Sequence, residues 1–271
     1  MGKTDDWFKV KEVANGVWAI AENSTDGNLK YLVAGEEKAL LVDTGWGIGD
    51  LAGLVHSLTP LPVTVALTHG HPDHIFGGMQ FPEVYLSNEE QKLPEFGENY
   101  SLKWRTIYAK NFEEPLPEGF STEAWIHTAP PKVLSFTSGH RFDLGNRIIE
   151  AQVLPGHTPG STILFDDREK LLITGDSILQ GDIWMHLDRS VPLHKYWHNL
   201  KDLNKQSDRF ERMLPGHAQT PINKDILNEL IEGIGEILEG KRTGEPYHTF
   251  VGDGTRCWFG RCGVIYNREN L

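Results

Sequence analysis

The sequence is poor in cysteine and in basic residues, and it has no long apolar run. Its two cysteines are Cys257 and Cys262, which we interpret as ordinary thiols in a reducing compartment, with a disulfide or a metal-binding pair as the alternative. The 26 basic residues are outnumbered by 38 acidic ones, for a net charge of −12. A surface of that charge repels phosphate backbones, so we expect no nucleic-acid partner.

Two further absences concern membranes and export. No uncharged apolar stretch approaches the roughly 18 residues that a membrane span requires. The first residues, Met-Gly-Lys-Thr-Asp-Asp-Trp, lack the apolar segment of a signal peptide. We therefore expect a cytoplasmic protein with no membrane partner and a small-molecule substrate. The sequence does not predict its oligomeric state.

What is present is a globular composition, with 39% hydrophobic and 24% charged residues. Apolar alternation and turn residues predict strands, and helical spacing predicts helices. A segment rich in aromatics and Glu, 81–138, reads as a partly helical insertion and candidate lid within a single domain of residues 1–271. The predicted strands are 16–21, 31–34, 39–42, 63–67, 133–136, 147–154, 162–165, 170–174 and 256–266, and the predicted helices are 47–58, 193–206 and 224–238.

The most informative segment is Thr68–His74, which reads Thr-His-Gly-His-Pro-Asp-His. Imidazole and carboxylate are the ligands that Zn²⁺ and similar divalent ions prefer. The apolar strand before it places the run where a buried strand ends and the chain turns, a rigid base for a metal site. The run holds more donors than one catalytic ion with an open position needs, which favours two metals.

Three later segments share one design, an apolar strand that ends in a turn with one metal-capable residue. They read Leu-Pro-Gly-His157, Thr-Gly-Asp176 and Leu-Pro-Gly-His217. Glycine and proline at these positions permit sharp turns that direct a side chain along the sheet edge. With the first run they form a set of five histidines and two aspartates suited to a two-metal hydrolytic site: His69, His71, Asp73, His74, His157, Asp176 and His217.

These motifs, in this order, resemble those of the metallo-β-lactamase superfamily, and Leu-Val-Asp43-Thr-Gly resembles the turn that opens that family's series. The resemblance covers roughly residues 16 to 220. It implies the α/β class, with an αββα four-layer sandwich of two mixed β-sheets flanked by helices. The metals would lie at one edge of the two sheets.

The resemblance also implies roles for individual residues. His69, His71 and His157 would hold one metal, and Asp73, His74 and His217 the other. Asp176 would bridge the two, and Asp43 would orient a ligand imidazole. Zinc is the expected metal for both positions, with iron or manganese as alternatives.

The expected reaction is hydrolysis of an ester, thioester or lactone by a hydroxide that bridges the two metals. Asp73 would orient that hydroxide and collect its proton. A bridging aspartate is similar to the glyoxalase II and lactonase branch, and true β-lactamases usually lack it. A mono-iron sulfur dioxygenase-like oxidoreductase, a β-lactamase and a metal-stabilised binding module remain alternatives.

The substrate does not follow from these motifs. In the family the region after Asp176 commonly borders the substrate, which makes His186 and Tyr196 candidate substrate contacts, with helix packing as the alternative for Tyr196. Arg256 and Arg261 could serve an anionic group, although solvated arginines are the simpler interpretation.

Overall fold

The computed structural model describes residues 7–23, 27–112 and 115–271. The chain divides into two compact units, Met1–Thr137 with Arg141–Ile148 and Ser138–His140 with Ile149–Leu271. We call them unit 1 and unit 2. That residues 1–271 form a single functional domain, with a lid at 81–138, remains a prediction from the sequence.

Unit 1 is built on a mixed sheet whose strands follow one another in sequence order. Neighbouring strands from β1 to β4 pair antiparallel, and neighbouring strands from β4 to β7 pair parallel. β4 is buried along its whole length, as its Ala-Leu-Leu-Val sequence predicts, whereas β1 is largely exposed. The strands are β1 (Phe8–Ala14), β2 (Val17–Glu22), β3 (Leu29–Ala34), β4 (Ala39–Val42), β5 (Val63–Ala66), β6 (Glu83–Ser87) and β7 (Lys132–Phe136).

The helices of unit 1 are short. Asp50 caps α1 by accepting a hydrogen bond from the Gly53 backbone N–H. Thr59 and Pro60 follow that helix and end it, close to the predicted boundary. The elements are α1 (Leu51–Leu58), α2 (Pro72–Ile75), η1 (Phe76–Gln80), α3 (Asn88–Gln91), α4 (Pro94–Asn99), α5 (Leu102–Ala109) and α6 (Thr122–His127).

The segment 81–138 is only in part the insertion that the sequence suggests. Its middle is helical as expected, but β6 and β7 at its two ends pair in parallel as strands of the main sheet. Its aromatic side chains pack on Phe76 and Trp46, with the Phe76 and Trp125 rings 5.0 Å apart. Both strands contribute to the core of the unit, β6 through Val84 and Leu86 and β7 through Val133.

Unit 2 holds a second mixed sheet in which the strands follow the order β14-β13-β11-β10-β9. β10 pairs antiparallel with β9 and β11, and β11 pairs parallel with β13. The chain passes between the units in β8 (His140–Asp143). The other strands are β9 (Ile148–Val153), β10 (Thr162–Asp166), β11 (Leu171–Gly175), β13 (Arg212–Pro215) and β14 (Ile222–Asn223).

A third sheet in unit 2 was not predicted. Its order is β12-β17-β16-β15, and the tail that reads as one strand at 256–266 forms two strands of a hairpin. The reversal at Gly260, which has a φ of +73°, escaped the prediction because apolar residues flank it closely. The strands are β12 (Asp182–Met185), β15 (Glu245–Thr249), β16 (Gly252–Phe259) and β17 (Cys262–Tyr266).

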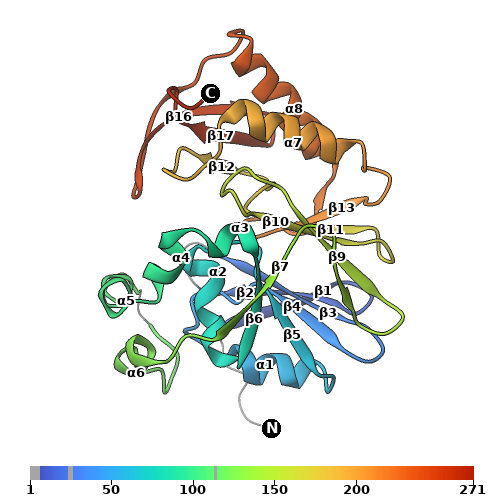
Figure 1. The fold of residues 1–271 in the computed structure, drawn as a ribbon, viewed down its shortest axis with the longest axis vertical. Helices are drawn as coiled ribbons and strands as arrows, with labels where there is room; N and C mark the ends of the chain where they lie inside the picture. The colour runs from blue at the N-terminus through green and yellow to red at the C-terminus, as the bar shows by residue number, and fades with distance from the viewer. Residues whose placement is uncertain (1–6, 24–26, 113–114) are drawn as a thin grey trace. The chain divides into compact units, whose positions relative to one another are not determined.

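Two amphipathic helices complete unit 2, α7 (Leu193–Asn204) and α8 (Asp225–Leu238), both close to their predicted bounds. They lie side by side (Figure 1), and the Trp197 indole donates to the Ile231 carbonyl oxygen at 2.8 Å. Phe259 of β16 packs on Gly233, where a Cβ would lie 2.3 Å from its ring. Cys257 and Cys262 are buried free thiols in this core. Among the described residues no helix combines the length and apolarity of a membrane span.

Candidate metal centre

The histidine run follows β5, as predicted, and then enters α2. His71 is the residue before Pro72, the first residue of the helix, and it has an extended backbone with φ −73° and ψ 147°. Proline favours that conformation in the residue before it and is itself suited to the first helical position. His74 lies one turn later and is fully buried. The local sequence thus turns a strand into a helix within the run itself.

The potential ligands of unit 1 gather in a small volume. The His69 Nε2 and His71 Nδ1 atoms are 3.0 Å apart, and the His69 and His74 ring centroids are 4.2 Å apart. An oxygen of Asp73 lies 3.3 Å from the Nε2 of His74. The run thus offers three imidazoles and a carboxylate, which are the donor types that divalent cations prefer.

Asp43 accepts hydrogen bonds from two residues of this run, Thr68 and His74. One carboxylate oxygen accepts from the Thr68 backbone N–H at 2.7 Å, and the other accepts from the Thr68 hydroxyl at 2.8 Å and from the His74 Nδ1 at 3.0 Å. Because Nδ1 of His74 donates to Asp43, its Nε2 keeps a lone pair on the side of Asp73. This is the contact that the sequence resemblance assigned to Asp43.

The backbone around the run is also held in place. The Thr44 backbone N–H and hydroxyl both donate to the His74 carbonyl oxygen at 2.8 Å, and the Gly77 N–H donates to the Gly45 carbonyl oxygen at 3.0 Å. Gly77 fits only because it lacks a Cβ, which would lie 2.0 Å from the Thr44 carbonyl oxygen. The turn at Asp43–Gly45 therefore fixes the position of α2 and of the potential metal ligands that this helix carries.

Two residues of the segment 81–138 support the same run. The Glu90 carboxylate accepts from the Gly70 backbone N–H, and the Asn99 side-chain amide donates to the Gly70 carbonyl oxygen, both at 3.0 Å. Both side chains belong to buried residues. Sequence reasoning missed them because one Glu and one Asn in a polar helical segment carry no motif.

In unit 2 three potential ligands meet at one edge of the sheet. Asp176 follows β11 and His217 follows β13, and these strands pair in parallel, so their carboxyl ends share an edge. An oxygen of Asp176 lies 3.4 Å from the Nε2 of His217 and 3.7 Å from the Nε2 of His157. The Nδ1 of His157 donates to the Trp184 carbonyl oxygen at 2.7 Å, which leaves its Nε2 facing Asp176. Two imidazoles and a carboxylate are donor types that divalent cations prefer.

The structure places Tyr196 in the hydrophobic core of unit 2. It is fully buried, its hydroxyl donates to the Ser177 carbonyl oxygen, and burial raises the pKa of that hydroxyl. The ring lies against Gly156, where a Cβ would approach it to 2.5 Å. Tyr196 thus packs beneath the turn that carries His157, with its hydroxyl engaged by the backbone.

His186 is also mostly buried, at the end of β12. Its Nε2 donates to the Thr249 hydroxyl oxygen at 2.9 Å, and burial followed by the nearby His157 lowers the pKa of the imidazole. A neutral imidazole that donates through Nε2 links β12 to the hairpin of β15 and β16.

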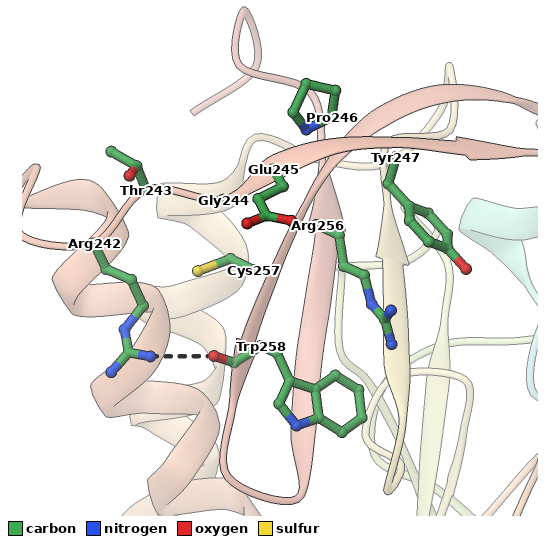
Figure 2. A pocket seen from close by; sticks show the side chains of 9 residues that line it. All are labelled: Arg242, Thr243, Gly244, Glu245, Pro246, Tyr247, Arg256, Cys257 and Trp258. Atoms are coloured by element: carbon green, nitrogen blue, oxygen red, sulfur yellow. Dashed lines mark hydrogen bonds between the residues drawn. The ribbon is translucent and has the colours of Figure 1, made fainter.

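The two arginines near the cysteines are paired with carboxylates. Arg256 bonds to Asp182 at 2.8 Å, and Arg261 bonds to Glu229. Arg256 lines a hollow of about 700 Å³ together with Tyr247 and Trp258, and the hollow is formed by β15, β16 and the residues just before β15 (Figure 2). Since the neighbouring Asp182 neutralises Arg256, the hollow has little excess positive charge for an anion.

Comparison with known proteins is consistent with this arrangement. Residues 28–217 match the family model described as the metallo-beta-lactamase superfamily. The chain is 26% identical to the acyl-coenzyme A thioesterase MBLAC2 of Homo sapiens over 79% of this chain and 82% of that protein. It is 28% identical to the hydroxyacylglutathione hydrolase GloC of Haemophilus influenzae over 55% of this chain and 65% of that protein.

Solved structures share the fold. A metallo-beta-lactamase from Pontibacter korlensis superimposes with a TM-score of 0.59 at 19% identity, over 84% of this chain and 99% of that one. The DIM-1 metallo-beta-lactamase superimposes with a TM-score of 0.58 at 14% identity, over 86% and 99%. At such identities the likeness concerns the fold alone, and it confirms the expected α/β class with mixed sheets.

Proposed function

This chain belongs to the metallo-β-lactamase superfamily and is a metal-dependent hydrolase, and from that premise we propose that it hydrolyses thioesters at a two-metal centre. The observation that carries the proposal is the pair of clusters of potential ligands, one in each unit, each with one imidazole oriented by a hydrogen bond at its Nδ1. The similarity to an acyl-coenzyme A thioesterase and to a hydroxyacylglutathione hydrolase favours thioesters over lactones.

As in the family that the sequence resembles, His69, His71 and His157 would hold one ion, and Asp73, His74 and His217 would hold the other. Asp176 would serve both. Zinc is the proposed metal, because histidine and aspartate sets of this kind suit it, and iron and manganese are accepted by the same donors.

When bound, divalent ions supply an acidified water and polarise the substrate carbonyl. The protein's own residues prepare this chemistry. Asp73, whose side chain is 17% exposed, can accept a proton from the attacking water, whereas the more deeply buried Asp43 is occupied by Thr68 and His74. Asp43 accepts from the Nδ1 of His74 and so orients the Nε2 of that imidazole. The thiol that leaves is a better leaving group than an alcohol, so no strong acid near it is required.

The test is to measure metal content and thioester hydrolysis of the purified protein, alone and as the Asp73→Ala variant. We expect two divalent ions per chain, hydrolysis that is lost with a chelator, and a loss of about 10²–10⁴-fold in kcat for Asp73→Ala. Asp202→Ala is the matched control, because that aspartate is exposed and bonds only on the surface to Lys205.

Three results would contradict the proposal. Unchanged turnover of metal-loaded Asp73→Ala would remove the proton-accepting role of Asp73. One iron per chain with oxygen consumption on a persulfide substrate would favour the dioxygenase alternative. Hydrolysis of β-lactams without hydrolysis of thioesters would favour a β-lactamase.

A further inference from the structure

The turn between β15 and β16 exposes two apolar residues where polar ones are usual. Phe250 is 90% exposed and Val251 is 51% exposed, and together they form the whole connection between Thr249 and Gly252. Two-residue hairpin turns favour Asn, Asp and Gly. The turn geometry therefore does not account for the presence of Phe250 and Val251 at these positions. Exposing a phenylalanine to water is also unfavourable.

Hydrogen bonds tie the base of this turn to β12. The Thr249 hydroxyl donates to the Gly252 carbonyl oxygen at 2.8 Å and accepts from His186 at 2.9 Å. Gly254 lets β16 approach β12 closely, since a Cβ there would lie 3.0 Å from the Cβ of His186. The turn thus occupies a defined position beside the end of β12.

A single residue, Trp184, connects this turn to His157, a proposed metal ligand. The Phe250 and Trp184 rings are 5.4 Å apart in an edge-on arrangement, and the Trp184 carbonyl oxygen accepts the hydrogen bond from His157. The Ser190 hydroxyl donates to the His157 carbonyl oxygen at 2.9 Å, which fixes the same loop from the other side. The Trp184 and Phe250 rings therefore form an apolar surface, which we call the aromatic wall, on the residue whose carbonyl oxygen bonds to His157.

We propose that the aromatic wall binds the acyl chain of the thioester, so that the enzyme prefers hydrophobic acyl groups over small polar ones. This inference rests on the proposed function. The occupant is the acyl part of the substrate because the wall is apolar and its Trp184 bonds through the backbone to His157, a proposed metal ligand. The polar side chains nearest to the turn on the hairpin, His248 and Asp253, bond to each other at 2.7 Å.

The experiment compares wild type and Phe250→Ala on straight-chain thioesters of increasing length carried by one common thiol. The loss in kcat/KM is expected to grow with acyl length and to reach roughly tenfold for the longest chain, as burial of a phenylalanine predicts. Phe250 is almost fully exposed, so the variant is expected to fold. Val10→Ala is the matched control, because Val10 is an exposed apolar residue of β1 in unit 1, 39% exposed.

Binding of the matching thioethers, which cannot be hydrolysed, is measured by calorimetry on the same proteins. Binding that tightens with chain length in the wild type and does so less in Phe250→Ala supports the wall. An identical chain-length profile in both proteins, or a uniform loss at every length, would overturn it. Absence of thioester turnover in the wild type would instead contradict the proposed function, and the thioether binding would still decide the role of the wall.

Exposed aromatic side chains also bind membranes, so sedimentation with vesicles of neutral and anionic phospholipid is included. Vesicle binding that Phe250→Ala abolishes, together with an unchanged acyl-length profile, would assign the turn to membrane docking and overturn the acyl site.

Discussion

The Asp43 carboxylate accepts a hydrogen bond from the Nδ1 of His74 at 3.0 Å, across 31 positions of the sequence. The same carboxylate takes two hydrogen bonds from Thr68, immediately before the histidine run. One buried acid thus fixes both the start of the run and the orientation of its last imidazole. Groups of this kind determine how strongly a neighbouring ligand binds a metal.

Replacing Asp43 with Asn is expected to weaken metal binding by about 10–100-fold, because the amide cannot accept from all three donors. Asn tolerates the backbone at this position, where φ is +62°, so the fold is expected to persist. Competition with a chelating dye measures the affinity. Asp50→Asn is the control, since Asp50 only caps α1 and Asn caps equally well. Equal affinities in both variants would contradict the orienting role of Asp43.

Replacing Gly77 with Ala is expected to lower the free energy of unfolding by about 1–3 kcal/mol, because the new Cβ collides with the Thr44 carbonyl oxygen. Gly97→Ala is the matched comparison. Gly97 lies exposed in α4 with open space at its Cβ position, and alanine there is expected to be neutral or to stabilise by about 0.5–1 kcal/mol. Urea denaturation of the two variants checks the contrast. Equal stabilities would mean that α2 can shift away from the Asp43–Gly45 turn.

Replacing Tyr196 with Phe separates a packing role from a substrate contact. The variant leaves the Ser177 carbonyl oxygen without its hydrogen bond from Tyr196 inside the core, which is expected to cost about 1–3 kcal/mol of unfolding free energy. Because the residue is fully buried, kcat/KM of the metal-loaded variant is expected to stay within about twofold of wild type. A large rise in KM without a loss of stability would assign Tyr196 to the substrate.

Stability at alkaline pH is expected to depend on Cys262. Burial raises the pKa of its thiol from the ordinary 9.0 to about 12. The folded state therefore favours the protonated thiol. Its contribution to stability is complete below the unfolded-state pKa and is lost as pH rises from 9.0 toward about 12.

The measurement is the melting temperature of wild type and Cys262→Ser across this range. Serine does not titrate there, so the melting temperature of the variant is expected to fall less steeply with pH than that of the wild type. Parallel curves would show that the thiol does not contribute.

Several features could be read directly from the sequence. The histidine run, the three later turn motifs and their order predicted the family and the fold class, and family and structural comparisons confirm both. The strands β2 to β5 and the helices α7 and α8 lie close to their predicted bounds. These elements have strong local signals, because apolar periodicity and turn residues act over a few positions.

Other features depended on contacts between distant residues. That Glu90 and Asn99 hold Gly70, and that Tyr196 is buried with its hydroxyl on a backbone carbonyl, follows from packing that no local pattern encodes. The third sheet was missed for the same reason, since β12 pairs in parallel with a strand far along the chain.

The sequence by itself determined which donors this protein offers a metal and, through their order, which family it belongs to. Ligand chemistry is a property of side-chain type and of short turns, and both are local. Only the tertiary structure decided how those donors are oriented and which apolar residues lie beside them. Asp43 meets His74, and Phe250 meets Trp184, because separate strands bring them together.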